Sequence, residues 1–317
     1  MKLIKKKYKK YRFINFLRLV SKKFKIFKLK KVKRYAGRTL LDAEQGNLLI
    51  RNALCEGRPF VAVRFGSSEL ATSIDAIAMD LGAKTEIRDK CMISLCRNAG
   101  FFPNDKSLAY EYGIKQAALI HNVDVFAVWG MNMEDFIINA YGKVDAKICL
   151  PRGFEPYYFE NPWSSQLKGK KVLVIHPFEK SIKKQYERRE KIFENTDILP
   201  EFELHTIKAV QSSAFSETDF KTWFDALTYM YNKAMEIDFD IALIGCGAYG
   251  LPLACMLKEA GKSAIHMGGA TQLLFGIKGK RWDNHPIISK LYNEYWVRPS
   301  EEETPNRANE VEGACYW

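Results

Sequence analysis

The first 38 residues lack aspartate and glutamate entirely, although they carry 17 of the chain's 49 lysines and arginines. Residues 39–317 therefore hold 32 basic and 37 acidic side chains, and the formal charge of +12 comes from the N-terminal segment. Proteins that bind nucleic acid need positive charge on the folded surface to neutralise phosphates. A body with more acids than bases argues against nucleic acid as a partner.

The sequence also lacks several motifs that define other classes of protein. Its seven cysteines are an odd number and form no Cys-x-x-Cys pair, which favours reduced thiols over disulfides or structural zinc. No Gly-x-x-x-x-Gly-Lys-[Ser/Thr] phosphate loop is present. No apolar run approaches the roughly 20 residues of a transmembrane helix, and no secretory cleavage site follows the N-terminal segment. We therefore expect a cytoplasmic protein.

Residues 1–37 are predicted to form a basic arm that is also rich in large apolar side chains. Phe13, Phe16, Leu17 and Val20, for example, stand between lysines and arginines. Such a segment can lie in the headgroup region of an anionic membrane, and residues 1–35 are the predicted contact. A solvated tail and a nucleic-acid contact are the alternatives, but neither needs so many apolar side chains. The predicted location is peripheral, at the inner face of the plasma membrane.

Residues 38–317 are predicted to form a single α/β catalytic domain. Short apolar runs end at glycine, proline or polar residues and are followed by helical patterns. These runs are residues 60–65, 123–129, 147–150, 171–176, 239–244 and 263–267. Strands that alternate with helices predict a Rossmann-like fold, with a mostly parallel sheet and helices on both faces. Residues 299–317 begin as an acidic tail but end in Cys-Tyr-Trp, so we expect the tail to dock on the domain.

The end of the first predicted strand is the first candidate site, because ligands of parallel α/β sheets bind beyond the carboxyl ends of strands. Arg64 is the penultimate residue of an apolar run, and Gly66, Ser67, Ser68 and Glu69 follow it. The two serines could cap the next helix or contact a phosphate. Glu69 is expected to be exposed in the first helical turn, where it could face a ligand. Capping alone leaves the arginine unexplained.

Two further strand ends carry candidate residues. His176 ends the run 171–176 and could act as an acid or base, although a structural histidine is the plainer interpretation. Gly245, Gly247 and Gly250 form a Gly-x-Gly-x-x-Gly pattern directly after the run 239–244, which is typical of a phosphate-binding turn. The acidic residue that would bind a ribose about 20 residues later is absent, so the pattern does not predict NAD specifically.

The last predicted strand leads into a glycine-rich stretch with a basic flank. It is expected to contact the diphosphate and the sugar or base of a nucleotide, unless it is only a structural loop. Its candidate residues are Gly268, Gly269, Gln272, Lys278, Lys280 and Arg281.

These segments resemble a bacterial family that occurs with capsule and exopolysaccharide biosynthesis proteins and is described as glycosyltransferases. The similarity runs from about residue 40 to the end of the chain. The matching segments are RFGSSEL (64–70), GFFP (100–103), PWSSQLKGKKVLVIHPF (162–178), FDIALIGCGAYGLPLA (239–254), GGATQLLFGIKGKRW (268–282) and VEGACYW (311–317).

A weaker resemblance links the chain to GT-D-fold glycosyltransferases, which are Rossmann-like enzymes that use nucleotide sugars. Their first strand leads into Arg-Phe-Gly-Asp-Gly-Glu, whose Asp-x-Glu is associated with a divalent metal and the donor. Arg64, Phe65, Gly66 and Glu69 match this motif, while Ser67 replaces the aspartate. The resemblance therefore implies Mn²⁺ or Mg²⁺, but with Glu69 as the one carboxylate left to hold it.

Together these observations predict a glycosyltransferase that moves a sugar from a nucleotide diphosphate donor to a lipid-linked glycan in bacterial surface polysaccharide synthesis. Glu69 or His176 is the predicted general base, and the arginine, serines, glycines and lysines named above are the predicted diphosphate contacts. An NAD-dependent oxidoreductase and a non-catalytic scaffold of a polysaccharide assembly are the alternatives.

Overall fold

The structure, a computed structural model, describes residues 1–23 and 28–317; residues 24–27 of the predicted arm lie outside this description. The strands are β1 (Arg34–Tyr35), β2 (Arg38–Leu41), β3 (Val61–Arg64), β4 (Val125–Ala127), β5 (Lys147–Cys149), β6 (Lys171–His176), β7 (Glu203–Lys208), β8 (Ile241–Ile244) and β9 (Ser263–His266). The helices are α1 (Lys2–Lys23), α2 (Ala43–Glu56), α3 (Ser67–Asp80), α4 (Asp89–Ala99), α5 (Lys106–Leu119), α6 (Glu134–Tyr141), α7 (Glu179–Tyr186), α8 (Trp223–Met235), α9 (Gly250–Glu259) and α10 (Thr271–Leu274).

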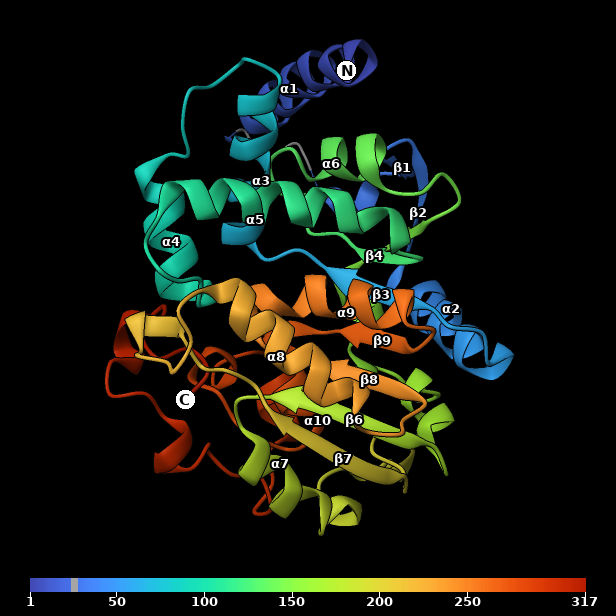
Figure 1. Cartoon of the computed structure of the whole chain (residues 1–317). Helices are drawn as coiled ribbons and strands as arrows, with labels where there is room; N and C mark the ends of the chain where they lie inside the picture. The colour runs from blue at the N-terminus through green and yellow to red at the C-terminus, as the bar shows by residue number, and fades with distance from the viewer. Residues whose placement is uncertain (24–27) are drawn as a thin grey trace.

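The strands form one sheet in the order β1-β2-β5-β4-β3-β9-β8-β6-β7. The β1–β2 pair is antiparallel and every other neighbouring pair is parallel. The last strand along the chain, β9, lies between β3 and β8 and joins the two halves of the sheet (Figure 1). The predicted Rossmann-like α/β fold with a mostly parallel sheet is confirmed.

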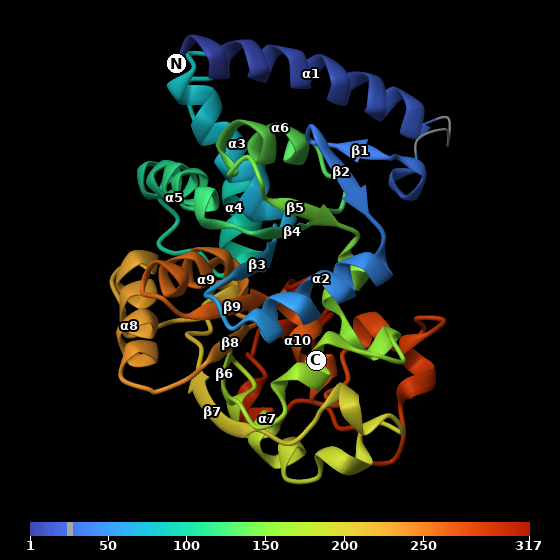
Figure 2. The same cartoon turned by 90° about the vertical axis from the view of Figure 1, so that its right-hand side faces the viewer.

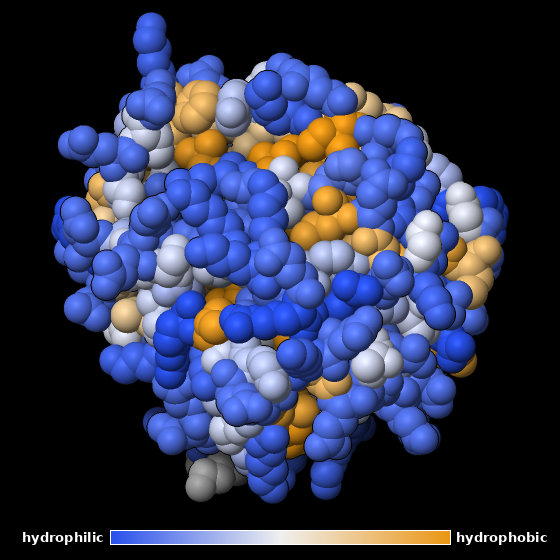
Figure 3. All heavy atoms as spheres, turned by 90° about the horizontal axis from the view of Figure 1, so that it is seen from below, coloured by the Kyte–Doolittle hydropathy of each residue, from blue (hydrophilic) through white to orange (hydrophobic). Residues whose placement is uncertain are grey.

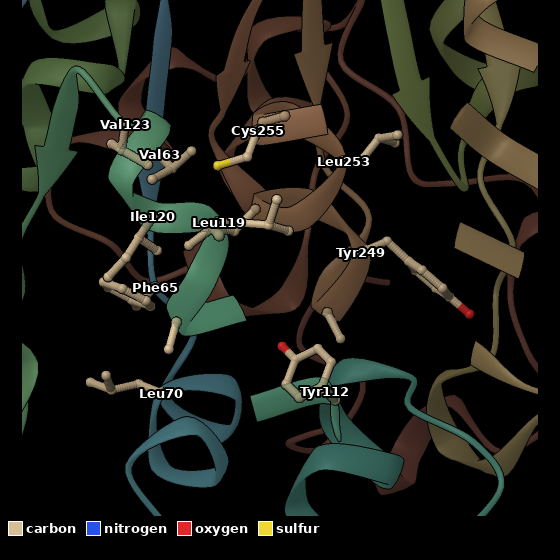
Figure 4. Packing of buried hydrophobic residues seen from close by; sticks show 14 of the residues in the cluster. Val63, Phe65, Leu70, Tyr112, Leu119, Ile120, Val123, Tyr249, Leu253 and Cys255 are labelled. Carbon is tan, nitrogen blue, oxygen red and sulfur yellow. The ribbon is translucent and has the colours of Figure 1, made fainter. Parts of the chain in front are cut away.

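Helices cover both faces of the sheet because alternate side chains of each strand point to opposite sides. In β8, Ala242 and Ile244 pack in the cluster formed with α3, α5, α8 and α9, whereas Ile241 and Leu243 pack in the cluster formed with α2, α7 and α10. Figure 4 shows part of the first cluster, with side chains from β3, α5 and α9 in one core. Both sides of the central strands are therefore apolar, as in other covered parallel sheets.

Side-chain caps begin several of the helices. Asp42 and Thr222 form capping boxes at the starts of α2 and α8, and Asp105 accepts two backbone N–H groups at the start of α5. At the start of α3, by contrast, Gly66 is the N-cap and no side-chain cap is formed. Capping therefore does not account for Ser67 and Ser68.

Most strand predictions agree with the structure to within a few residues. The run 171–176 is β6 to the residue, and the other five runs contain β3, β4, β5, β8 and β9. The sequence analysis missed β7, because most of its side chains are polar and this edge strand is only partly buried. It also missed the short strands β1 and β2. The face near β7 is correspondingly hydrophilic, with small apolar areas (Figure 3). All seven cysteines are free thiols, and only Cys55 is exposed.

The basic N-terminal segment packs on the body instead of extending from it. Helix α1 lies across α6 at the β1–β2 end of the sheet (Figure 2). Tyr8 and Tyr11 are buried, and their rings contact the ring of Phe136 in α6, Tyr8 edge-on with centroids 5.4 Å apart. The predicted boundary after residue 37 falls inside the β1–β2 hairpin. None of the helices in the described part of the chain is long and apolar enough to cross a membrane.

A buried polar contact holds α1 in place. The side-chain amide of Asn15 donates to Asp135 Oδ1 at 2.8 Å, and its Oδ1 accepts the backbone N–H of Met133 at 3.1 Å. Arg18 forms an ion pair with the same aspartate, whose side chain is fully buried. Because an unpaired buried polar group costs about 1–3 kcal/mol, these contacts fix both the position and the rotation of the helix.

Replacing Asn15 with leucine should therefore lower the free energy of unfolding by about 1–3 kcal/mol, since the shape is kept but the Met133 N–H and Asp135 each lose a partner. Urea denaturation measures the change. Lys9→Gln, at an exposed position of the same helix, is the control and should stay within about 0.5 kcal/mol of the native protein. Equal stability of Asn15→Leu and Lys9→Gln would contradict this description of α1.

Candidate functional site

The carboxyl ends of four neighbouring strands open into one cavity. Strands β3, β9, β8 and β6 lie side by side in the sheet and end at Arg64, His266, Ile244 and His176. A cavity of about 430 Å³ is lined by these strand ends, by the turns that follow them and by the C-terminal residues. Ligands of parallel α/β sheets bind at this edge, so we take the cavity as the candidate functional site.

Most of the predicted site residues line this cavity. They are Arg64, Gly66, Ser67, Ser68, Glu69, His176, Gly245, Gly247, Gly268, Gly269, Gln272 and Arg281. Gly250, Lys278 and Lys280, which were also predicted as diphosphate contacts, are not among the residues that line it. Gly250 packs against the ring of His266, and the Lys278 ammonium lies 5.2 Å from the centroid of the Tyr292 ring.

Glu69 lines the cavity but is buried, so the expectation of an exposed first-turn acid is wrong. Its carboxylate lies over Gly66, where an added Cβ would come within 2.1 Å of Oε2. Burial raises the pKa of Glu69, and backbone N–H groups at residues 69 and 68, together with the charge of Arg64, partly oppose the increase. The structure thus supplies a carboxyl group that holds its proton more strongly than a carboxyl group in water.

Arg64 lines the cavity at the end of β3. Its Nη1 lies 3.5 Å from Glu155 Oε1, and both side chains are largely buried. The guanidinium lies 5.6 Å from the centroid of the Trp129 ring, which gives it a cation–π contact at the cavity wall. It also packs on Gly268, where a Cβ would come within 2.8 Å of Nη2. The arginine that capping could not explain is therefore held in place by contacts from three segments.

His176 is a neutral imidazole with a defined proton position. Its Nδ1 accepts the backbone N–H of Phe178 at 3.0 Å, so Nε2 carries the proton. Burial lowers the pKa of His176 to about 3. A neutral imidazole whose lone pair already accepts a hydrogen bond is a hydrogen-bond donor to a ligand, which disfavours the predicted role of His176 as general base.

His266 has the opposite arrangement and was given no role in the sequence analysis. Its Nδ1 is 3.2 Å from the carbonyl oxygen of Ile244, an atom that can only accept, so Nδ1 carries the proton and Nε2 has the lone pair. Burial, with a smaller contribution from the charge of Arg64, lowers the pKa of His266 to about 3. The two histidines therefore give the cavity one neutral donor and one neutral acceptor. The position of His266 at the end of a predicted strand was the signal that could have identified it.

The glycines of the Gly-x-Gly-x-x-Gly turn are required by the protein itself. A Cβ at Gly245 would lie 2.6 Å from His176 Cδ2, and one at Gly250 would lie 2.1 Å from the ring of His266. Gly247 has φ +56°, and a Cβ there would lie 2.5 Å from the backbone oxygen of Ala99. Close packing of protein groups therefore accounts for all three glycines, and the pattern alone no longer indicates a phosphate-binding turn.

The C-terminal residues form one wall of the cavity. Tyr316 and Trp317 line it, and the Tyr316 ring packs on Gly269. The side-chain amide of Gln272 donates to the backbone oxygens of Lys278 and Tyr316. Its own Oε1 is buried and finds no hydrogen-bond partner among the described residues. Gln272 therefore fixes the wall through its amide N–H groups.

Arg281 supplies a second cation on this wall. It forms an ion pair with Glu312, and its guanidinium lies 4.8 Å from the centroid of the Tyr316 ring. Arg281 and Glu312 both line the cavity, as do Arg64 and Glu69. The formal charges of these four groups balance, so an anionic ligand would have to interact with the arginines while displacing or protonating a carboxylate.

The residues present do not form a ready metal site. Among the described residues, no group of three or more histidine, cysteine, aspartate or glutamate side chains is arranged to hold a metal ion. Glu69, the carboxylate that the resemblance implies, lies over Gly66 and has no second acidic side chain beside it in such a group of the described residues. We therefore derive no step through Mn²⁺ or Mg²⁺.

Aromatic side chains of the wall were also missed by the sequence analysis. Trp129 follows β4 and lines the cavity, although it is 48% exposed. Because it ends a predicted strand run, the same strand-end rule that selected Arg64 could have found it. Tyr316 and Trp317 end the tail that was expected to dock on the domain, but no strand-end signal placed them at the cavity. Their place depends on the path of a long C-terminal segment without strands.

Comparisons with known proteins add little to this geometry. No protein-family model matches the chain, and the comparison with curated proteins gives no match. Among solved structures, the chain is similar to a selenomethionine-substituted structure of domain of unknown function 1792 (DUF1792), with a TM-score of 0.43 and 14% identity. The similarity covers 75% of this chain and 80% of that chain.

Gly247→Ala should lower the free energy of unfolding by about 1–3 kcal/mol because alanine is strained at a positive φ. The close contact of the added Cβ with the backbone oxygen of Ala99 should add a further loss to this strain. Gly169→Ala is the matched control, since Gly169 also has a positive φ but open space around the added Cβ. The control should show the strain alone, about 1–2 kcal/mol. Urea melts of both variants separate the two contributions. If both variants lose the same free energy of unfolding, the backbone near Ala99 moves to make room for the added Cβ, and the contact is not what requires glycine at position 247.

Stability should fall on acidification because both buried histidines stay neutral in the folded protein. Their folded pKa values of about 3 lie below the ordinary value of 6.5, so unfolding takes up protons and stability is lost from about pH 6.5 downwards. Each histidine should contribute a slope of about 1.4 kcal/mol per pH unit between pH 6 and 4. His176→Asn keeps an acceptor for the Phe178 N–H and should remove one such slope. An unchanged slope in urea melts across this range would refute the assignment.

Proposed function

We propose that the protein is a glycosyltransferase that uses a nucleotide diphosphate sugar and transfers the sugar to a glycan carried on a lipid, in bacterial surface polysaccharide synthesis. The observation that supports the proposal is the composition of the cavity at the four strand ends. It combines two arginines, a buried carboxyl group with a raised pKa, and aromatic side chains. Each of these groups suits one part of such a reaction.

The two arginines suit the diphosphate. Arg64 and Arg281 present planar guanidinium groups, which bind phosphate oxygens in pairs. Each guanidinium is held against a carboxylate and an aromatic ring, so its position is set before a ligand arrives. Fixed positive groups of this kind stabilise a diphosphate as negative charge develops on it during departure. The Nε2–H of His176 is a further, neutral donor at the same edge.

Glu69 suits the removal of a proton from the acceptor hydroxyl. A general base works best when its pKa lies near the working pH, and burial moves the pKa of Glu69 in that direction. The positive charge of Arg64 lowers the pKa of Glu69 and so partly offsets the effect of burial. A diphosphate bound to Arg64 would neutralise that charge, and the pKa of Glu69 would rise further. The base would then be strengthened when the donor is in place.

The aromatic wall suits the flat or apolar parts of the donor. Trp129, Tyr316 and Trp317 offer ring faces on which a base or a sugar ring can stack. A volume of about 430 Å³ lies in the range of sites for small molecules and cofactors. The oxidoreductase alternative depended on the glycine-rich turn, whose glycines are required by protein contacts, so we do not propose it.

Two variants should separate donor binding from chemistry. Arg281→Gln should weaken binding of UDP-sugars about 10- to 100-fold, because it removes charge-assisted hydrogen bonds worth about 1.5–3 kcal/mol. Glu69→Gln should bind donor nearly normally but lose about two orders of magnitude or more in turnover. Calorimetric titration measures binding, and release of the nucleoside diphosphate measures turnover, with and without Mn²⁺ or Mg²⁺.

Matched controls are available outside the cavity of the same protein. Arg307→Gln removes an exposed arginine that pairs with Glu310 and lies over the ring of Phe215, and Glu179→Gln changes the first-turn acid of α7. Neither residue lines the cavity. Both should behave like the native protein. Absence of donor binding and turnover across a panel of nucleotide sugars would leave the non-catalytic scaffold as the better hypothesis.

A further inference from the structure

Helix α1 has two opposite faces, of which one is covered by the body of the protein. Tyr8, Tyr11 and Asn15 are buried against α6 and its preceding loop. These positions are spaced by three and four residues and so lie on one side of the helix. The other side faces away from the body along the whole length of α1 (Figure 2).

The outward side carries a single stripe of exposed residues that changes character halfway along. Its first half is basic and its second half is apolar. At spacings of three and four residues, the stripe consists of Lys2, Lys6, Lys9, Phe13, Phe16 and Val20, with Leu17 beside it. The exposed fractions of the apolar side chains are 64% for Phe13, 61% for Phe16, 49% for Leu17 and 42% for Val20. None of these four apolar side chains belongs to a hydrophobic cluster of the described residues.

Further cations surround the stripe, and no acid lies near it in the sequence. Lys5, Lys10 and Arg12 are exposed in the same helix, and residues 28–34 add several more exposed lysines. The lysines of the stripe form no ion pair or hydrogen bond through their side chains with any residue that the structure describes. Their charge is therefore available to an external anionic surface.

We propose that this outward stripe of α1 docks on an anionic lipid bilayer, with the helix lying in the plane of the interface. The lysines would lie among phosphate headgroups, and Phe13, Phe16, Leu17 and Val20 would enter the boundary of the acyl chains. Amphipathic helices with basic and aromatic residues bind membranes in this manner. A bilayer interface presents anionic headgroups and acyl chains along the whole length of a helix that lies on it. The basic half of the stripe can therefore contact headgroups while the apolar half contacts acyl chains.

The docked helix also reaches the wall of the cavity through one loop. Met133 bonds to Asn15, and Gly130 packs against Leu29, in the segment that follows α1. The backbone N–H groups of Trp129, Gly130 and Met131 all bond to the carboxylate of Glu134. Trp129, at the start of this loop, lines the cavity. Membrane docking is independent of the chemistry in the cavity, but it would hold the cavity wall at a fixed position relative to the bilayer.

Co-sedimentation of the full chain with vesicles tests the proposal. The native protein should bind vesicles of phosphatidylglycerol and phosphatidylcholine and should not bind phosphatidylcholine alone. The triple variant K2Q/K6Q/K9Q should weaken partitioning by about two orders of magnitude, from about 1 kcal/mol per lysine near the surface, and the native binding should weaken with salt. The quadruple variant F13A/F16A/L17A/V20A should lose the part of binding that survives high salt.

Each variant has a control with the same number of lysine or apolar replacements at exposed positions elsewhere. K90Q/K221Q/K290Q matches the lysine variant, and L48A/I93A/V144A/I287A matches the apolar variant. Thermal unfolding of all variants should match the native protein, because only exposed side chains change. Equal vesicle binding by the stripe variants and their controls would overturn the proposal. The proposal would also be overturned if the native protein were an oligomer and F13A/F16A/L17A/V20A made it a monomer without changing its lipid binding. The stripe would then be a contact between copies of the chain.

Deleting residues 1–38 is not a suitable test, because it would remove β1 and expose the α6 face that Tyr8 and Tyr11 cover. Loss of membrane binding and loss of the cavity's function are also distinguishable. The stripe variants should retain nucleotide-sugar binding in solution, because no residue of the stripe lines the cavity. Conversely, Glu69→Gln should sediment with vesicles like the native protein.

Discussion

A guanidinium at the end of a buried strand sets the conditions for the rest of the site. Arg64 stands where an apolar strand leaves the sheet, and its charge is balanced by Glu155 while its plane lies against Trp129 and the backbone of Gly268. The same charge acts on Glu69 and on His266. Glycine at position 268 is needed to accommodate this cation, because an added Cβ would come within 2.8 Å of Arg64 Nη2. The site is therefore organised around an electrostatic centre that the fold has already enclosed.

The sequence predicted the sheet well because the central strands have a strong physical signal. Residues 171–176 and 239–244 are continuous apolar runs that end at glycine, proline or a polar residue, and both faces of such strands are buried. The edge strand β7 has polar side chains at most positions and was missed. The strand-end rule then selected Arg64, Glu69 and His176 correctly as residues of one edge, since the ends of parallel strands gather there.

Other features depend on contacts that no local pattern contains. The burial of Glu69 and the proton positions of the two histidines follow from tertiary packing, so the sequence could name the residues but not their charge states. The glycine-rich turn resembles a phosphate-binding turn because glycine is needed wherever another group approaches the backbone closely. At Gly247 that group is the backbone oxygen of Ala99 and not a ligand. Likewise, the rotation of α1 is set by Asn15 and Asp135, which lie 120 residues apart.

The position of β9 has a consequence for how the molecule is made. Strands β2 to β5 on one side and β6 to β8 on the other meet only through this last strand, which pairs with β3 and β8. During synthesis, the two half-sheets leave the ribosome before the strand that joins them, and each carries an unpaired inner edge until residues 263–266 arrive. Joining them requires contacts between residues about 200 positions apart, which is a slow kind of folding step. Arg64 and Gly245 lie on opposite sides of β9 and both line the cavity. A ligand that contacts both would therefore stabilise the joined form of the two half-sheets.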